Sequence, residues 1–301
     1  MMAPPLVTET SASSVGDSNA DNTMHVSSGP ETTKTFTVFD INVLQETLQS
    51  PTSDDAAILH AIRGFRRLLS VEKAPPVVEV LDSGALPIFV KLLEHRHDDI
   101  ILEAAWALTN VASTEHTAAV VDHGAVPYLV NLLLSANEHV REQCAWCLGN
   151  IAGDSPKLRD CILQAGAMEP ILKNIEHPAN TSLLGNVVWT LSNFCRGKPQ
   201  PEISLVKASL PHLLSIVQSN PNKDIVIDAC WALSYLCDGD DERIQQVMEI
   251  GVTQKLVEFL SDSSTSLIAP ALRTLGNFAT GNDEQTQVSD IGILFFQLSC
   301  S

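Results

Sequence analysis

The sequence is poor in positive charge. It holds 18 Lys and Arg residues against 36 Asp and Glu residues, which gives a formal net charge of −18 at pH 7. Nucleic acids and anionic membranes are bound by basic surfaces that neutralise phosphate, so we expect neither as a partner. Basic peptides are the natural electrostatic complement of such a chain.

Long apolar segments are also missing. No stretch approaches the roughly 18 consecutive apolar residues that a membrane-spanning helix requires. Met1 and Met2 do not lead into the basic and apolar regions of a secretory signal. We therefore expect an intracellular protein of the cytoplasm and nucleus.

Residues suited to metal binding or catalysis are few. The seven cysteines are odd in number and lie mostly in apolar helical patterns, so we expect reduced core residues. Cys144 and Cys147 form a CxxC pair, but no second pair or histidine stands at zinc-site spacing. His95 and His97 lie in a polar turn, where a solvated loop is expected. No nucleophile with a nearby base and no phosphate-binding glycine loop is evident, so we expect no enzyme, metal or cofactor.

One phrase with Trp and Asn four residues apart recurs along the chain. This spacing places both side chains on one face of an α-helix. The three full copies are Trp106-Ala-Leu-Thr-Asn110, Trp146-Cys-Leu-Gly-Asn150 and Trp189-Thr-Leu-Ser-Asn193. Two degenerate copies follow, Trp231-Ala-Leu-Ser-Tyr235 and Arg273-Thr-Leu-Gly-Asn277. Their intervals of 40, 43, 42 and 42 residues indicate that the same helix face returns once per structural repeat. We call each copy a rung and the series the ladder.

A second phrase, usually a glycine followed closely by a proline, recurs with the same period. Its members begin at Gly84, Gly124, Gly166, Ala208, Gly251 and Gly292. The glycine suits the end of one short helix, and the proline suits the first turn of the next. A unit of about 42 residues with three helices predicts an all-α armadillo-repeat solenoid, a right-handed superhelix of three-helix repeats. The same helix from each unit would then line one concave groove.

The ends of the chain differ from this periodic region. Residues 1–35 are rich in Ser, Thr, Pro, Asp and Asn, and we expect them to be disordered. We expect N-terminal capping helices in residues 36–73, armadillo repeats in residues 74–281 and a truncated partial repeat in residues 282–301. The apolar residues 293–296 of that partial repeat would be exposed.

Several segments closely resemble the importin alpha (karyopherin alpha) family of nuclear import adaptors. They include ILEAAWALTNVAS, REQCAWCLGNIAGDSPKLRD and VVWTLSNFCRGKPQP, and the resemblance runs from about Phe36 to Val288. It implies a binding protein whose concave Trp and Asn residues hold the extended, Lys/Arg-rich nuclear localisation signal of a cargo protein. An Asn carboxamide can pair with a peptide main chain, and parallel indoles can hold the stems and cationic heads of Lys and Arg.

The resemblance also implies which residues contact the peptide. The predicted set is Trp106, Asn110, Ser113, Thr117, Gln143, Trp146, Asn150, Asp154, Trp189, Asn193, Arg196, Trp231, Tyr235 and Asp238, with Arg273 and Asn277 as weaker members. Asp154 is the expected selector of lysine. The segment from Ser113 to Thr117 is two residues shorter than the family pattern, which puts a backbone acceptor beside Asp154 in question. For a single rung, core packing is the more common role of such a tryptophan, whereas three rungs in register favour peptide binding.

Two departures from the family leave the transport function open. Family members begin with a basic segment that binds importin beta and competes for the groove, whereas Lys34 is the only Lys or Arg before Arg63. On the resemblance importin beta would be a partner, but on this composition we do not expect the chain to bind it. The family pattern also continues through further repeats after Val288. The alternative is therefore a truncated armadillo scaffold or decoy that binds signals or other proteins without supporting import.

Overall fold

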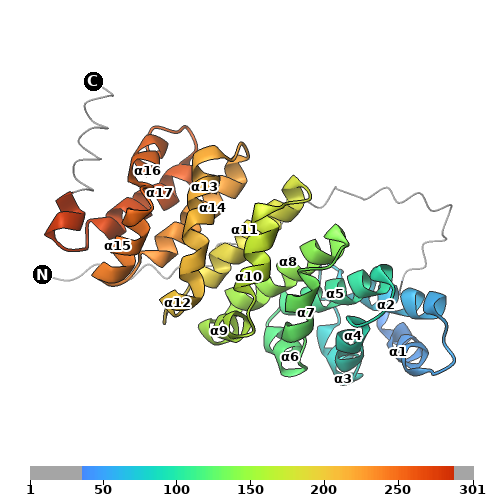
Figure 1. Cartoon of the computed structure of the whole chain (residues 1–301). Coiled ribbons are helices and arrows are strands. Elements are labelled where there is room, and N and C mark those ends of the chain that lie inside the picture. Colours follow the sequence, from blue (N-terminus) through green and yellow to red (C-terminus); the bar gives the residue numbers. More distant parts are fainter. Residues whose placement is uncertain (1–35, 288–301) are drawn as a thin grey trace, which may run out of the picture. The chain divides into compact units, whose positions relative to one another are not determined.

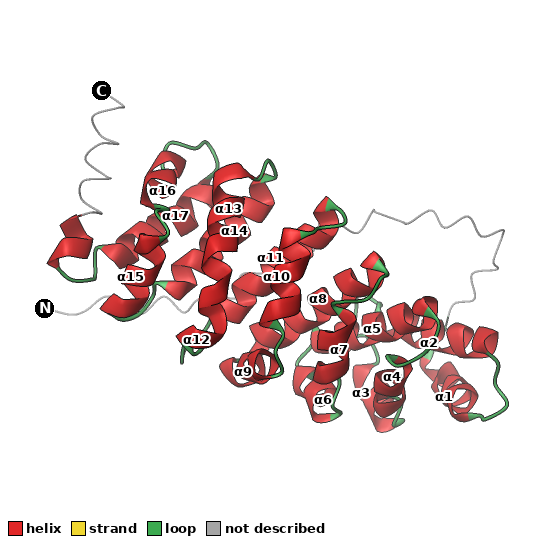
Figure 2. Cartoon of the chain, viewed as in Figure 1, coloured by secondary structure: helices red, strands yellow, loops and turns green. Residues whose placement is uncertain are grey.

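The computed structural model describes residues 36–287, and every regular element in this range is a helix (Figures 1 and 2). The helices are α1 Ile41–Gln49, α2 Asp55–Leu69, α3 Val77–Asp82, α4 Leu86–Leu92, α5 Asp98–Ala112, α6 Thr117–Asp122, α7 Val126–Leu132, α8 Glu138–Asp154, α9 Pro156–Gln164, α10 Met168–Glu176, α11 Thr181–Cys195, α12 Ile203–Val206, α13 Leu210–Ser219, α14 Lys223–Leu236, α15 Asp241–Glu249, α16 Thr253–Phe259 and α17 Thr265–Phe278. Short 3-10 turns, η1 Val38–Asp40 and η2 Lys207–Ser209, precede α1 and α13. The predicted all-α class is confirmed.

Five three-helix repeats follow α2, in the predicted order of a short helix, a second helix and a long third helix. Four of the predicted glycines end the first helix of a repeat with φ between 76° and 83°, a conformation that only glycine adopts without strain. These are Gly84, Gly124, Gly166 and Gly251. The repeat that has Ala208 instead of glycine makes this corner with the 3-10 turn η2. Prolines stand in the first turn of α4, α7 and α13, as expected.

The third helices stack on one another through the whole described region. Helix α2 packs on α5, α5 on α8, α8 on α11, α11 on α14 and α14 on α17, so neighbours in Figure 1 are neighbours in space. One continuous apolar core runs along this stack from Phe36 to Phe278. Each repeat therefore buries its apolar face only against the next repeat, which is how a solenoid is stabilised.

At the N-terminal end, α2 takes the place that the third helix of a repeat has elsewhere in the stack, and it packs on α5. The Asp54 side chain accepts a hydrogen bond from the Ala57 amide at 2.9 Å and so caps the N-terminus of α2. Its core residue Phe65 packs edge-on against Phe89 of α4 with ring centroids 5.0 Å apart.

The apolar residues of α1 and of the turn before it do not all lie in the core. Ile41 and Leu44 are buried, but Phe39 is 89% exposed and Val43 is 62% exposed. Phe39 lies in η1, ahead of the helix. Val43 follows Ile41 by two residues, or roughly 200° around the helix, and so points away from α2.

The cysteines of the described region are free, and most are buried in the core. Burial raises the pKa of the Cys147 thiol to about 12 and that of Cys144 well above its usual value. Both thiols therefore stay protonated, as expected for packing residues. Residues 36–287 contain no grouping of His, Cys, Asp and Glu suited to a metal ion.

His95 and His97 lie in the polar turn between α4 and α5, as expected, and both imidazoles contact Asp55. Nε2 of His97 lies 2.9 Å from Oδ2 of Asp55, and Nε2 of His95 lies 3.4 Å from Oδ1 of the same residue. Asp55 belongs to α2, so this turn links one third helix to the next.

Within the described residues, no helix is long and apolar enough to cross a membrane. The segments predicted to be disordered or to form a partial repeat, residues 1–35 and most of 282–301, lie outside the residues that the structure describes.

Candidate peptide-binding site

All five rungs lie on third helices, namely α5, α8, α11, α14 and α17. These helices pack side by side in sequence order (Figure 1), so the rungs that they carry form one row. Trp146 on α8 is 40% exposed, and the other three tryptophans are half-buried. The row is therefore a surface feature with a rigid core behind it, and it includes all four tryptophans of the chain.

Each ladder asparagine is tied to the third helix that precedes it. Its amide nitrogen donates to a backbone carbonyl at 2.9–3.4 Å. The pairs are Asn110 with Arg66, Asn150 with Thr109, Asn193 with Gly149, and Asn277 with Ser234. The idea that these residues join neighbouring helices thus accounts for one N–H group of Asn150 and of Asn193, whereas the amides of Asn110 and Asn277 also donate to Ser70 and to the Cys237 sulfur. The second N–H and the side-chain carbonyl of Asn150, one turn from the exposed Trp146, can still pair with a ligand backbone.

The indole of Trp189 lies against the backbone of the preceding helix at Gly149. A Cβ atom built at Gly149 would lie 2.3 Å from Cζ3 of Trp189 and 2.8 Å from Oγ1 of Thr190. Both distances are shorter than a van der Waals contact. Glycine is therefore required at this place for Trp189 to keep its position in the row.

Asp154, the predicted lysine selector, is the last residue of α8 and is exposed. Its neighbours Ala152, Gly153, Ser155 and Pro156 form one wall of a hollow of about 200 Å³, and Arg196, Gly197 and Lys198 form the other. Asp154 and the predicted residue Arg196 thus lie at the same hollow, beside the second and third rungs. The selector role stays a prediction.

Three further predicted contacts use their polar atoms within the protein. Gln143 is 7% exposed and donates to Oγ1 of Thr109 at 2.8 Å. Thr117 is 2% exposed, and its hydroxyl donates to the Thr114 carbonyl at 2.7 Å. Ser113 is exposed and caps α5 by donating to the Asn110 carbonyl at 2.8 Å. A peptide contact through the Thr117 side chain would need this turn to move.

At the C-terminal end of the ladder, the acidic residue Asp238 is already paired with basic side chains of the protein. The carboxylate of Asp238 accepts from Lys198 at 3.1 Å and from Arg273 at 3.2 Å. The ring of Tyr235 stacks on Trp231 with centroids 5.9 Å apart. Asp238 is therefore less available to a ligand than Asp154.

Sequence reasoning missed a sixth rung at the other end. Arg66 in the last turn of α2 and Ser70, which follows the helix, stand four residues apart, 40 residues before Trp106 and Asn110. The Arg66 guanidinium lies 4.5 Å from the centroid of the Trp106 ring, and Ser70 accepts from the Asn110 amide at 2.9 Å. The regular 40-residue interval was the signal that could have found this pair.

Asp228 was also missed, although it lies one helical turn before Trp231 on α14. Burial, reinforced by the negative charge of Asp224, raises the pKa of the Asp228 carboxyl to about 7. A ligand cation beside the Asp228 carboxyl would stabilise its ionised form and so oppose the rise in its pKa. Asp228 is therefore a candidate acidic contact near the fourth rung.

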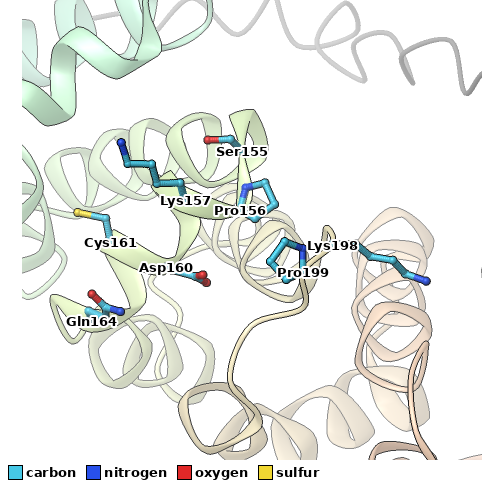
Figure 3. A pocket seen from close by; sticks show the side chains of 8 residues that line it. All are labelled: Ser155, Pro156, Lys157, Asp160, Cys161, Gln164, Lys198 and Pro199. Atoms are coloured by element: carbon cyan, nitrogen blue, oxygen red, sulfur yellow. The ribbon is translucent and has the colours of Figure 1, made fainter.

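A larger hollow of about 720 Å³ adjoins the first, over α9 and the loop at Lys198, and shares Ser155, Pro156 and Lys198 with it (Figure 3). Its lining residues are Ser155, Pro156, Lys157, Asp160, Cys161, Gln164, Lys198 and Pro199. It includes no ladder residue. The buried Arg159 donates to the Arg196 carbonyl at 2.6 Å and to the Pro199 carbonyl at 2.8 Å, which fixes the loop between the two hollows.

The armadillo character of the repeats is shown independently. The Armadillo/beta-catenin-like repeat model matches residues 73–113, 113–153, 155–196 and 199–238, more than half of the chain. The chain therefore belongs to the armadillo-repeat family.

Importin alpha subunits are close relatives. Importin subunit alpha-1a of Oryza sativa subsp. japonica is 52% identical over 173 residues, 56% of this chain and 33% of the relative. Importin subunit alpha-2 of Arabidopsis thaliana is 50% identical over 171 residues, 56% of this chain and 32% of the relative. Across the repeats, the chain is therefore similar to importin alpha subunits at about 50% identity. It spans about a third of the length of these relatives.

Solved structures agree on the fold. A designed armadillo repeat protein in complex with the peptide (KR)4 superposes with a TM-score of 0.72 at 25% identity, over 79% of this chain and 99% of the designed one. The predicted solenoid is confirmed, and the family assignment supports a non-enzymatic binding protein.

Proposed function

We propose that the ladder binds Lys/Arg-rich nuclear localisation signals in extended conformation and that the chain serves as a nuclear import adaptor. The observation that carries the proposal is the row of rungs on successive packed helices. A strip of groups repeating along a solenoid matches an extended chain, whose own groups also repeat along a line.

The chemistry of the rungs fits a basic ligand. The Asn150 amide keeps one N–H donor and its side-chain carbonyl, which can pair with a peptide backbone regardless of the peptide's side chains. Tryptophan faces attract Lys and Arg at roughly 0.5–2 kcal/mol each. Asp154 is exposed at the smaller hollow, where its carboxylate can select an ammonium group.

Two similarities support the same ligand. The relatives at about 50% identity are named importin subunits, which fits an adaptor in nuclear transport. The designed armadillo protein with the same fold was solved with a peptide of alternating Lys and Arg. The net charge of −18 also favours association with a basic peptide at low ionic strength.

Calorimetric titration with a Lys-rich signal peptide tests the proposal. We expect saturable binding that weakens with added salt and is largely lost in the double variant Trp146→Ala, Asn150→Ala. Asp154→Lys should also weaken it, because the selector becomes a like charge. Leu134→Ala is a matched control, since Leu134 is 56% exposed and lies in the turn before α8, outside the ladder. Affinity that survives both ladder variants would refute the proposal.

Delivery into the nucleus is a separate step that requires cargo and importin beta together. A pull-down with importin beta, with and without cargo peptide, tests it. Retention of importin beta supports the adaptor. Peptide binding without retention would identify a scaffold or decoy instead.

A further inference from the structure

Two separate segments of the chain form the walls of the smaller hollow at Asp154. One wall is the corner between α8 and α9, and the other is the start of the loop that follows α11. This loop, residues 196–202, runs from the end of α11 to the start of α12 without a helix of its own. Because Arg196 belongs to the loop and Asp154 to the corner, the placement of these two charges depends on what holds the loop.

The side chain of Arg159 on α9 links the two walls. It is fully buried, and its guanidinium donates to the carbonyls of Arg196 at 2.6 Å, Gly197 at 3.4 Å and Pro199 at 2.8 Å. The Asp160 carboxylate accepts from Nε and Nη2 of the same guanidinium at 2.9 and 2.8 Å and fixes its orientation. A planar group with five donors can serve several loop carbonyls and a carboxylate together, whereas the compact ammonium of a lysine cannot.

Gly197 lets the loop approach this guanidinium closely. Its φ is 101°, and a Cβ atom at this position would lie 3.3 Å from Nη1 of Arg159 and 3.3 Å from Cγ of Pro156. A side chain here would be strained and would push the loop away from α9. Arg159 and Gly197 therefore act together on the position of Arg196 across the hollow from Asp154.

The far end of the loop is held by a different arginine. Arg243 on α15 donates to the Pro201 carbonyl at 2.6 Å. The Gln200 side chain donates to the Tyr235 carbonyl at 3.2 Å. Neither Pro201 nor Gln200 lines one of the two hollows. The two ends of the loop can therefore be disturbed separately, and Arg243 is the matched comparison for Arg159.

Resting on the proposed function, we propose that Arg159 is a positioning residue of the peptide site that acts through Arg196. It holds the backbone from which the Arg196 guanidinium extends, opposite the Asp154 carboxylate. Side chains two residues apart in an extended peptide point to the same side at about 7 Å, close to the roughly 8–10 Å between packed helices such as α8 and α11. A lysine at Asp154 therefore brings the side chain two residues away to Arg196, where an acidic group is favoured.

The charge of the molecule makes an acidic preference at this place distinctive. The chain has a formal net charge of −18, which disfavours an acidic peptide side chain over most of the surface. Lys198, the other cation of this wall, lies 3.1 Å from Oδ1 of Asp238, so its charge is already shared with a carboxylate. Arg196 is therefore the group that turns repulsion into attraction, and it does so at one position of the peptide.

A peptide scan tests this role. Each position of a Lys-rich signal peptide, and of three flanking residues at either end, is replaced in turn by Glu or by its isostere Gln. Calorimetry gives the ratio of the two association constants, which does not depend on the fraction of folded protein. For the unaltered chain we expect Glu to bind about two- to fivefold tighter than Gln at one position, the effect of an exposed ion pair, and no tighter elsewhere. In Arg196→Gln this preference should disappear.

Three further variants separate positioning from stability. Arg159→Lys should lower the Glu preference to near one although Arg196 is intact, and it should have no further effect on the ratio in the Arg196→Gln background. Gly197→Ala displaces the same wall with Arg159 in place and should also lower the preference. Arg243→Lys is the control, because it disturbs only the far end of the loop. It should lower the midpoint of urea unfolding, as Arg159→Lys does, and keep the preference.

The outcomes distinguish this role from the proposed function. Peptide binding without a Glu preference at any position would overturn the role of Arg159 and leave the proposed function intact. A preference that is lost in Arg196→Gln but survives both Arg159→Lys and Gly197→Ala would also overturn it. So would its loss in Arg243→Lys, because the preference would then follow stability. If the Lys-rich peptide does not bind the unaltered chain at all, the proposed function fails and this inference fails with it.

Discussion

The middle of the ladder and its ends are built on the same helices but differ in what their tryptophans face. In the middle, Trp146 is 40% exposed, and Asn150 joins it on the same helix face. At the ends, Trp106 and Trp231 face Arg66 and Arg273, which Glu103 and Asp238 hold. Tryptophans at equivalent positions of the repeat can therefore differ in their availability to a ligand cation. The side chain of the neighbouring rung determines whether the indole face is free or already faces an arginine.

The largest expected difference between the two regions is in peptide affinity. Trp146→Ala should weaken a Lys-rich peptide by at least about thirtyfold, the effect of losing roughly 2 kcal/mol at a central anchor. Trp106→Ala should weaken it only about two- to fivefold, since Arg66 already occupies one face of Trp106. Calorimetry measures both, with thermal unfolding as the check that each variant folds. Equal losses would remove the distinction between middle and ends.

A second test displaces the central tryptophan Trp189 through the helix on which it packs. Gly149→Ala places a methyl group where the ring of Trp189 lies, so the indole must shift. We expect a loss of about 1–3 kcal/mol in the free energy of unfolding, as for overpacking in a close-packed interior, and weaker peptide binding. Urea unfolding and calorimetry measure the two effects. Gly166→Ala separates them, because no atom lies within 4 Å of its Cβ position and only its φ of 83° is strained; it should cost stability without a matching loss of affinity.

The ion pairs of the two end arginines should also contribute differently to the free energy of unfolding. Glu103→Gln removes the carboxylate that holds both Arg63 and Arg66 in a site only 10% exposed, and we expect a loss of about 1–3 kcal/mol in the free energy of unfolding. Asp238→Asn acts on more exposed pairs and should cost less than about 1 kcal/mol. Urea unfolding at neutral pH measures both, and the reverse order would contradict the stronger hold on Arg66.

The smallest effect concerns Asp228. Its carboxyl pKa is about 7 in the folded protein against an ordinary value of 3.8, so the folded state holds the proton more tightly than the unfolded state. Its contribution to stability is therefore most favourable below about pH 4, and it declines as the pH rises through 7. Asp228→Asn should remove this decline. A peptide cation nearby would favour the ionised carboxylate, so affinity should rise about two- to fivefold from pH 6 to pH 8 and stay level in the variant.

The fold followed closely from the sequence because its signals are periodic. A returning helix face and the returning glycine and proline corners each carry one repeat length, and the corners at Gly84, Gly124, Gly166 and Gly251 lie where expected. Phe39 and Val43 show the limit. They lie in a short segment where apolar residues alone do not define the buried face.

The site was less predictable, because contacts between repeats decide it. The sequence placed the rungs but gave no sign that Thr117 and Gln143 use their polar groups within the protein. Arg66 escaped notice because it is neither Trp nor Asn, although it keeps the 40-residue interval. Asp228 escaped because its environment, not its type, raises its pKa.

The most direct test follows the four indole N–H signals by NMR during titration with a Lys-rich signal peptide. The ladder contains every tryptophan of the chain, so the spectrum reports on this surface alone, and four single Trp→Phe variants assign the signals. The account predicts saturable shifts that are largest at Trp146 and Trp189 and smallest at Trp106 and Trp231. Shifts confined to the terminal tryptophans, or absent from Trp146, would contradict it.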